Sequence, residues 1–373
     1  MKARHKDIYI CSTVRHLLFS LYKAQENKKQ AVIVFFYDFQ NIDPLQIDTT
    51  QTPKNINLIL VNRKSLVKHI KKSGLIGRFI LFCSLRGLSI SKSTQCNLVD
   101  LFKTYDDNLD FDFTINTLFL FNDNNKMSRL FRLLSKSYSM LEDGMGNYIE
   151  HKIESKPKQV LRYIQGKQPK YYVFGEKDQC KEVYAIHPNN LPKSIMHKGK
   201  RLMLSKDKAI VDSIKTCFRF KEEPSFSDNG LIIATQPVFT EIKDKLISDN
   251  FFLDIYKIII LLSREKGLTP ILKLHPLEQR SDYLSIENEG AIFLSNKLPL
   301  ELYLLSSTEK TNIITINSSV GIGMEEYCNV YNLIPDDKVS NYMEVLSDYE
   351  KNRESLQEII SIQLSKIKQL STQ

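Results

Sequence analysis

Residues 138–148 read Tyr-Ser-Met-Leu-Glu-Asp-Gly-Met-Gly-Asn-Tyr, a short apolar strand followed by two adjacent carboxylates and a turn bracketed by glycines. In an α/β protein, the loop at the carboxyl end of a parallel strand is where ligands bind and chemistry is done. Two neighbouring acids repel each other, and this arrangement favours a base with a raised pKa at Glu142 or Asp143. The ordinary structural alternative is an acidic, solvated turn before a linker.

Two further strand ends carry polar side chains. Residues 271–276, Ile-Leu-Lys-Leu-His-Pro, read as a buried strand that ends in His275, with a proline that stops the hydrogen-bonding ladder. Residues 312–321, Asn-Ile-Ile-Thr-Ile-Asn-Ser-Ser-Val-Gly, read as a strand, then Ser318 and Ser319, then a helix start. Serine hydroxyls and free N–H groups at a helix N-terminus favour an anion. Each motif alone has an ordinary structural explanation, but the three in this order predict a functional site.

Strands and helices alternate along the chain as βαβ units, which predicts an α/β fold with parallel sheets. In the first half we expect strands over residues 8–11, 31–37, 57–61, 78–82, 117–121 and 138–141, and helices over 15–25, 65–72 and 126–135. In the second half we expect strands over residues 230–235, 271–274, 291–294, 312–316 and 330–333, and helices over 251–266, 300–306, after residue 318 and over 342–370.

The pattern is interrupted over residues 155–225, where Lys and Pro are frequent and residues 205–218 form the clearest helix. We therefore predict an N-terminal Rossmann-like domain over residues 1–225 that includes this inserted helical and hairpin region. We also expect a C-terminal Rossmann-like domain over residues 226–373 that ends in a helix. Each of these domains is large enough to bury its own core.

The carboxylate turn, the strand-His-Pro motif and the strand-Ser-Ser motif resemble, in order and spacing, the motifs of bacterial sialyltransferases, including the lipooligosaccharide and polysialic-acid families. A fourth position also resembles these enzymes. Glu301, in Leu-Pro-Leu-Glu-Leu over residues 298–302, lies seventeen residues before Ser318, where such enzymes place a carboxylate on the nucleotide ribose. The resemblance implies the glycosyltransferase B architecture, in which two Rossmann-like domains face each other across a cleft. The N-terminal domain is then expected on the acceptor side, and the C-terminal domain is expected to bind the nucleotide sugar.

The resemblance also implies the reaction, an inverting transfer of sialic acid from CMP-sialic acid to a hydroxyl of a surface glycan such as lipooligosaccharide or capsule. Asp143 matches the general base. Glu142 is either a neighbour that tunes the pKa of Asp143 or the base itself. His275 matches the acid or charge partner of the departing phosphate, and so also contacts the nucleotide.

The remaining positions are expected to bind the nucleotide. Ser318 and Ser319 match the phosphate ligands of these enzymes, and Glu301 the ligand of the ribose hydroxyls. Thr235 and Gln236 follow the first strand of the second domain, where they are placed to line the same site.

Two other classes of protein stay open. One is another glycosyltransferase of lipopolysaccharide or capsule assembly, such as a hexosyltransferase, whose uridine diphosphate sugar would need a site for two phosphates. The other is a non-catalytic nucleotide- or glycan-binding protein, which would not need a base at Asp143. A second His-Pro pair begins at His187, but it lies in the irregular region and is the less favoured catalytic candidate.

Composition is consistent with a globular enzyme, at 42% hydrophobic and 25% charged residues. Six cysteines are scattered without paired spacing, which indicates buried thiols in a reducing cytoplasm and not a disulfide framework. Since no His/Cys cluster suggests a metal site, we expect a metal-independent reaction with no cofactor beyond the donor substrate.

The formal net charge of +9 is diffuse, with clusters at residues 68–72 and 198–201. It favours attraction to anionic lipid headgroups, an acidic glycan or a nucleotide sugar. Nucleic-acid binding is not favoured, because no basic-aromatic platform accompanies the charge. Without a cleavable signal or an apolar span, the chain is expected to be cytoplasmic and peripheral at the inner face of the cytoplasmic membrane.

Overall fold

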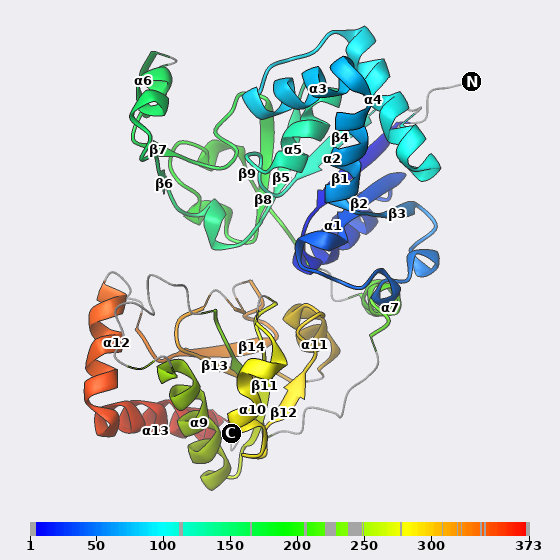
Figure 1. Cartoon of the computed structure of the whole chain (residues 1–373). Coiled ribbons are helices and arrows are strands. Elements are labelled where there is room, and N and C mark those ends of the chain that lie inside the picture. The colour runs from blue at the N-terminus through cyan, green and yellow to red at the C-terminus, as the bar shows by residue number, and fades with distance from the viewer. Residues whose placement is uncertain are drawn as a thin grey trace. The chain divides into compact units, whose positions relative to one another are not determined.

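The computed structural model in Figure 1 divides the chain into two α/β units, Met1–Phe220 and Lys221–Gln373, which are considered separately. The domain boundary expected between residues 225 and 226 falls within residues 221–228, outside the described residues, and stays a prediction. The structure describes residues 5–111, 115–164, 166–204, 207–220, 229–237, 248, 250–276, 278–307, 309–318, 320–321, 323–335, 338 and 341–370.

The first unit is built on a seven-stranded sheet with the order β3-β2-β1-β4-β5-β8-β9, in which every neighbouring pair is parallel. Its strands are β1 (Lys6–Cys11), β2 (Ala31–Phe36), β3 (Ile56–Val61), β4 (Ile115–Leu120), β5 (Tyr138–Leu141), β8 (Cys180–Ala185) and β9 (Gly199–Arg201). β2 and β5 are buried along their whole length, as expected for parallel strands covered on both faces. The strand order reverses between β1 and β4, which is the position where doubly wound proteins bind ligands.

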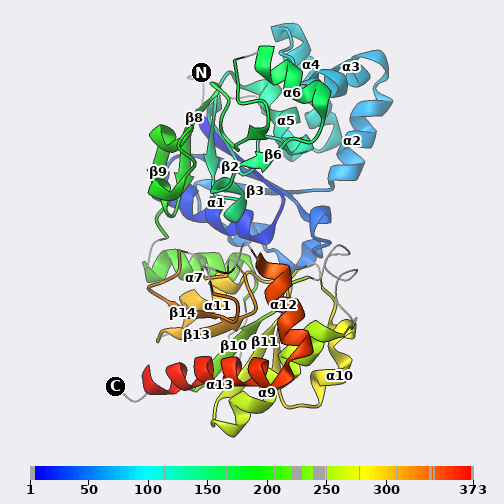
Figure 2. The same cartoon turned by 90° about the vertical axis from the view of Figure 1, so that its left-hand side faces the viewer.

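The helices of this unit are α1 (Val14–Asn27), α2 (Arg63–Lys72), α3 (Gly74–Arg86), α4 (Lys92–Tyr105), α5 (Lys126–Phe131), α6 (Lys156–Ile164) and α7 (Lys208–Cys217). Figure 2 shows α2, α3 and α4 gathered on one side of the unit. The strand expected over residues 78–82 is wrong, because these residues lie within α3. The apolar run there misled the prediction. Ile80 is buried, whereas Phe79 and Phe82 are about half exposed, a helical and not a strand pattern.

The region expected to be an insertion contributes to the main sheet. β8 pairs with β5 and β9 pairs with β8, whereas β6 (His151–Lys152) and β7 (Tyr171–Tyr172) form a separate antiparallel pair next to α6. β8 ends just before Ile186 and His187, at the same edge of the sheet as the end of β5. The prediction that His187 lies away from the Rossmann-like strands is therefore wrong.

The second unit contains a five-stranded parallel sheet with the order β12-β11-β10-β13-β14. Its strands are β10 (Gly230–Ala234), β11 (Thr269–Lys273), β12 (Ile292–Leu294), β13 (Thr311–Thr315) and β14 (Cys328–Asn332). The helices are α9 (Phe251–Glu265), α10 (Leu284–Glu287), α11 (Leu300–Ser306), α12 (Tyr342–Lys351) and α13 (Arg353–Leu370). The C-terminal helix α13 adds Leu356, Ile360, Leu364 and Ile367 to the core of this unit, at helical spacing.

The helix expected after Ser318 is wrong for the described residues, since residues 320–321, 323 and 325–327 form turns. Gly321 has φ = 77°, and a Cβ there would lie 2.5 Å from Cγ2 of Val330. This position therefore needs glycine both for its backbone conformation and for its close packing on β14.

Candidate active site

Polar side chains from distant parts of the chain meet at the carboxyl edge of the first sheet. β1 leads to His16 in the first turn of α1, β4 leads to Asn122, and β5 leads to Glu142 and Asp143. These strands lie next to one another around the β1–β4 reversal. The sequence pattern identified only the two acids. His16 was missed because it lies 127 residues before Asp143, and no local spacing connects them.

The carboxylate of Asp143 is hydrogen-bonded to the imidazole of His16, with 2.5 Å between Oδ1 and Nε2. The imidazole is held from two other directions. Its ring stacks on Phe121 at 3.9 Å between centroids, and the backbone N–H of Ser12 donates to Nδ1 at 3.2 Å. Because Nδ1 accepts, the N–H of the ring lies on Nε2 and is donated to Asp143. The pair is thus oriented before any substrate binds.

Asp143 is held in its ionised form. Burial acts to raise the pKa of this carboxyl, but the electrostatic interaction and the hydrogen bond with His16 outweigh burial, and Asn122 and Arg15 act in the same direction. The pKa of Asp143 therefore lies below its ordinary value. The prediction of a base with a raised pKa is wrong for this residue. About a quarter of its side chain is exposed, so the carboxylate is accessible.

Glu142 points to different partners and is fully buried. Its carboxylate lies 3.2 Å from the guanidinium of Arg15 and accepts from the Ile186 backbone N–H at 2.8 Å and from the Tyr148 hydroxyl. The divergence of the two acids agrees with the period of two along a strand. Glu142 therefore ties β5 to α1 and to the end of β8, with no surface left for an acceptor hydroxyl.

The turn after β5 fixes the backbone of Asp143. The N–H of Asp143 donates to Oδ1 of the buried Asn147 at 2.7 Å. Gly144 has φ = 126°, which side chains with a Cβ rarely adopt. His151 donates from Nε2 to the Gly146 carbonyl at 2.8 Å, and its ring stacks on aromatic neighbours. Gly144 thus serves the geometry of the turn, and Gly146 leaves room for the ring of Phe174, which a Cβ would approach to 3.0 Å.

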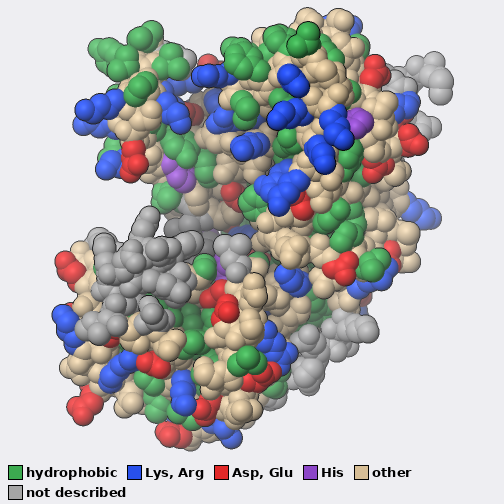
Figure 3. Space-filling view, viewed as in Figure 1, with side chains coloured by type: hydrophobic (Ala, Val, Ile, Leu, Met, Phe, Trp, Pro, Cys, Tyr) green, Lys and Arg blue, Asp and Glu red, His purple; other side chains and the backbone are tan. Residues whose placement is uncertain are grey.

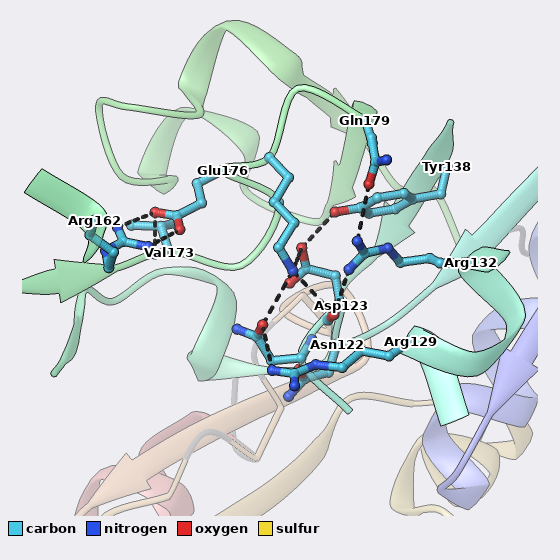
Figure 4. Close-up of polar contacts among 12 residues, drawn as sticks. Asn122, Asp123, Arg129, Arg132, Tyr138, Arg162, Val173, Glu176 and Gln179 are labelled. Carbon is cyan, nitrogen blue, oxygen red and sulfur yellow. Dashed lines mark hydrogen bonds and ion pairs between the residues drawn. The ribbon is translucent and has the colours of Figure 1, made fainter. Parts of the chain in front are cut away.

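A buried carboxylate beside Asn122 holds the loop that follows β4 (Figure 4). Asp123 is almost fully buried, accepts from the Tyr138 hydroxyl at 2.5 Å and lies 3.3 Å from Nζ of Lys177. Arg132 donates to the Asp123 carbonyl at 3.2 Å. Because Tyr138 is the first residue of β5, this network connects the end of β4 to the strand that carries Asp143.

In the second unit, His275 follows β11 at the carboxyl edge of the sheet. Its backbone N–H donates to Oγ1 of Thr235 at 3.0 Å and to Oε2 of Glu278 at 2.9 Å. The Thr235 hydroxyl donates to the same carboxylate oxygen at 2.5 Å, and the Tyr283 hydroxyl donates to the other at 2.5 Å. Glu278 thus joins the ends of β10 and β11, a role that the sequence pattern did not indicate.

The environment of His275 favours its neutral form. Burial, and then the positive charge of Lys273, lower the pKa of His275 below its ordinary value of about 6.5. Lys273 is itself buried and donates to the Leu274 carbonyl at 3.3 Å. An anion beside the imidazole would oppose both effects, since an opposite charge favours protonation.

Gln236 connects the end of β10 to the turn that contains Ser318. Its Oε1 accepts from the backbone N–H of Asn317 at 3.2 Å. Oγ of Ser318 accepts from the N–H of Val320 at 3.2 Å, so this serine closes a turn and does not cap a helix. Ser319 lies outside the described residues.

Glu301 lies in the first turn of α11, the helix that follows β12. Its charge contributes to the raised pKa of the thiol of Cys328, the first residue of β14. The residues after β10, β11 and β13 lie where the parallel strands of the second sheet end. The structure thus gathers Thr235, Gln236 and His275 closely, with Ser318 joined to them through Gln236.

The described residues contain no group of three or more His, Cys, Asp or Glu side chains arranged to bind a metal ion. The six cysteines are unpaired, and only Cys96 is exposed. In the part of the chain that the structure describes, no helix combines the length and the apolar character needed to cross a bilayer.

The chain is similar to known proteins at the level of family and fold. The family model of glycosyltransferase family 52 matches residues 83–334, which is more than half of the chain. A 2,6-sialyltransferase of Photobacterium sp. JT-ISH-224, solved with CMP and lactose, has a TM-score of 0.50 at 10% identity, and the alignment covers 95% of this chain and 76% of that one. The sialyltransferase of Photobacterium damselae, solved as its GT-B domain, has a TM-score of 0.43 at 10% identity, over 91% of this chain and 96% of that one.

No curated protein matches this sequence. The solved Photobacterium sp. structure confirms the expected glycosyltransferase B fold class, and the family match confirms the resemblance to bacterial sialyltransferases. A purely binding, non-catalytic protein is thereby excluded. The chain is a glycosyltransferase, and it belongs to glycosyltransferase family 52.

Proposed function

We propose that this enzyme transfers sialic acid from CMP-sialic acid, with inversion, to a hydroxyl of a bacterial surface glycan such as lipooligosaccharide or capsule. The observation that carries the proposal is the pair formed by Asp143 and His16, an accessible carboxylate held ionised at the carboxyl edge of the first sheet. The family match supports it, and so does the similar fold of a sialyltransferase that was solved with CMP and lactose.

In this proposal, Asp143 takes the proton of the acceptor hydroxyl. Its lowered pKa makes it a weak base, but one that is ionised at every pH near neutrality. A weak base is sufficient because the hydroxyl proton becomes strongly acidic as the oxygen bonds to the anomeric carbon. His16 orients the carboxylate throughout through Nε2–H, and Glu142 supports the strand end without contacting substrate.

The second unit is proposed to stabilise the departing cytidine monophosphate. His275 gains a proton beside the phosphate, because the phosphate charge opposes the burial that lowers its pKa. Ser318 and Ser319 donate hydroxyl hydrogen bonds to the phosphate, and Glu301 accepts from the ribose hydroxyls. Thr235 and Gln236 shape the nucleotide site, where their side chains already hold neighbouring backbone in place.

Thermal unfolding with added nucleotides tests the choice of donor. A ligand that binds only the folded protein at about 100 times its dissociation constant stabilises it by about 2.7 kcal/mol. We expect a rise in melting temperature with cytidine monophosphate that exceeds the rise with uridine diphosphate at equal concentration. Preference for uridine diphosphate would instead support a hexosyltransferase, and the proposed donor would be wrong.

A surface glycan carried on a lipid would be met at a membrane. We therefore propose peripheral contact of this protein with the anionic inner face of the cytoplasmic membrane. The formal net charge of +9 supports this part of the proposal.

The serine pair is expected to affect the donor more than the acceptor. The double variant Ser318→Ala with Ser319→Ala loses two charge-assisted hydrogen bonds to phosphate. Each such bond contributes about 1.5–3 kcal/mol to binding. The Michaelis constant for the donor should rise at least about tenfold, and that for the acceptor should change little. If the donor constant stayed unchanged, Ser318 would only close the turn to Val320.

Transfer is expected to survive a strong metal chelator. In the proposed scheme, His275 and the two serines compensate the phosphate charge, and a divalent cation has no assigned role. Initial rates with and without ethylenediaminetetraacetate check this expectation. Complete loss of activity that magnesium or manganese restores would favour a hexosyltransferase with a nucleoside diphosphate donor.

The pH dependence of the rate is expected to change in His16→Phe. This variant keeps an aromatic ring on Phe121 but removes the Nε2–H group, and with it the electrostatic interaction and hydrogen bond that lower the pKa of Asp143. Burial remains and raises that pKa, so the base becomes protonated at a higher pH than in the wild type. The acid limb of the kcat profile should therefore move to higher pH. Superimposable profiles would show that His16 does not control the ionisation of Asp143.

A further inference from the structure

The helix α3 presents a row of large apolar side chains to solvent. Leu75 is 85% exposed, and Phe79 and Phe82 are about half exposed at spacings of four and three residues, which places them on one side of the helix. Leu85, in the last turn of α3, and Leu88, just after the helix, continue the row, each about half exposed. The opposite side of α3 is buried against the unit. Large contiguous apolar surface of this kind marks an interaction site.

The surroundings of this row are strongly basic. Residues 49–99 contain nine Lys or Arg and no Asp or Glu, so this single stretch carries a charge equal to the formal net charge of the whole chain, +9. It includes α2, α3 and the start of α4. The exposed cations closest in sequence to the row are Lys68, Lys71, Lys72, Arg78 and Arg86. In Figure 3, hydrophobic and basic side chains are intermingled where Figure 1 places these helices. The net positive charge, which was expected to be diffuse, is therefore concentrated in residues 49–99.

A basic cavity of about 280 Å³ adjoins the carboxyl end of the row. Arg129, Arg132 and Lys136 line it, together with Leu88. Arg129 donates to the Leu85 carbonyl at 3.0 Å, and Arg132 donates to a carbonyl and an amide oxygen. Nε of Arg132 is buried without a partner. Guanidinium groups that meet neutral acceptors keep their charge available, and their geometry suits a phosphate.

We propose that the solvent face of α2 and α3, with this cavity, docks on a bilayer that contains anionic phospholipid. The apolar row enters the boundary between headgroups and acyl chains, as in interfacial helices. Lys and Arg beside it extend their charged ends to lipid phosphates, and the cavity takes one phosphate. This inference rests on the peripheral membrane contact proposed above and assigns its surface, but it does not depend on the sugar that is transferred.

One observation favours a bilayer over a second copy of this chain as the partner, and another favours α3 over α6 as the docking helix. A second copy docked through the same face would bring two strongly positive surfaces together, which electrostatic repulsion opposes. The helix α6 also exposes apolar side chains, but its Arg162 is paired with Glu176 at 2.5 Å, and the acidic Glu154 precedes it. Among the described helices with exposed apolar side chains, α3 lies in the longer acid-free stretch, residues 49–99, whereas the stretch around α6 spans residues 155–175 and is bounded by Glu154 and Glu176.

Sedimentation of the full chain with lipid vesicles tests the proposal. Vesicles of phosphatidylcholine alone are compared with vesicles in which about a third of the lipid is phosphatidylglycerol. We expect binding to the anionic vesicles only, weakening as salt rises. Phe79→Asp with Phe82→Asp, and Lys71→Glu with Lys72→Glu, should each lower the partition coefficient at least about tenfold, since one basic residue contributes about fivefold. Leu284→Asp, at a side chain of the second unit that is 60% exposed, is the matched control and should bind like the wild type.

Absence of wild-type binding to anionic vesicles would overturn the proposal, and an acidic protein partner would then be the better explanation of this face. The proposal would also be overturned if both the α3 and the α2 variant partitioned onto anionic vesicles like the wild type. The same holds if the Leu284→Asp control lowered the partition coefficient as much as they do. The same variants should transfer sugar to a soluble acceptor at the wild-type rate, because their side chains lie outside the candidate site. Failure of the wild type to use CMP-sialic acid would refute the proposed donor and leave the vesicle result standing.

Discussion

Replacement of Asp143 by Asn is expected to lower the rate constant for transfer by at least about 100-fold, because it removes the general base. Asn keeps the size of the side chain, and its amide oxygen still accepts the Nε2–H of His16, so the local fold is retained. The affinity for cytidine monophosphate should stay within about twofold of the wild type, because the proposed nucleotide ligands lie in the second unit. Single-turnover rates and nucleotide titrations measure the two quantities separately.

Glu142→Gln is the matched control and should behave differently. This buried carboxylate is hydrogen-bonded by Arg15, Tyr148 and the Ile186 backbone. Loss of its charge weakens charge-assisted hydrogen bonds and leaves Arg15 with a neutral partner, so we expect about 1–3 kcal/mol lower stability and a smaller loss of rate. If Glu142→Gln proved the more damaging to the rate while it remained stably folded, Glu142 would be the base.

His275→Ala is expected to reduce transfer by at least about 100-fold with the protein still folded. The contacts that hold this strand end are made by the backbone N–H of His275, which alanine keeps, so the Thr235 and Glu278 hydrogen bonds persist. What is lost is the imidazole that protonates beside the departing phosphate. Steady-state kinetics, together with circular dichroism to verify the fold, check this expectation.

His187→Ala is the matched control for the second His-Pro pair. Like His275, His187 follows a parallel strand, and its backbone N–H donates to the Tyr148 hydroxyl at 3.2 Å, a contact that alanine also keeps. We expect a much smaller effect on transfer, because the proposed phosphate ligands belong to the second unit. Near wild-type turnover in His275→Ala with loss in His187→Ala would show that the motifs were assigned to the wrong histidine.

Local sequence pattern was a good guide to the strands that carry the candidate site. β5 and α11 lie at the residues expected, and β10, β11 and β13 lie within two residues of their predictions, because buried parallel strands are short β-branched and apolar runs. The same rule failed at α3. An apolar run was assumed to be a buried strand, but in α3 only one side is buried, at Ile80, and Phe79 and Phe82 remain about half exposed.

The pattern was also insufficient at Ser318, where a serine pair before glycine suggested a helix start. The close approach of Gly321 to Val330 is a packing constraint between β14 and the turn, and no local spacing reveals it. The Ser318 hydroxyl accordingly accepts from Val320 within a turn.

The sequence by itself determined the α/β class, the positions of most strands and the three motifs at their ends, since periodicity and capping chemistry are local properties. Only the tertiary structure decided which of two adjacent acids is accessible and which is buried, and that Asp143 is ionised by a histidine 127 residues away. The physical reason is the strand order. Parallel strands that are distant in sequence end side by side at the β1–β4 reversal, and the pKa of a carboxyl depends on the neighbours that this topology brings to it.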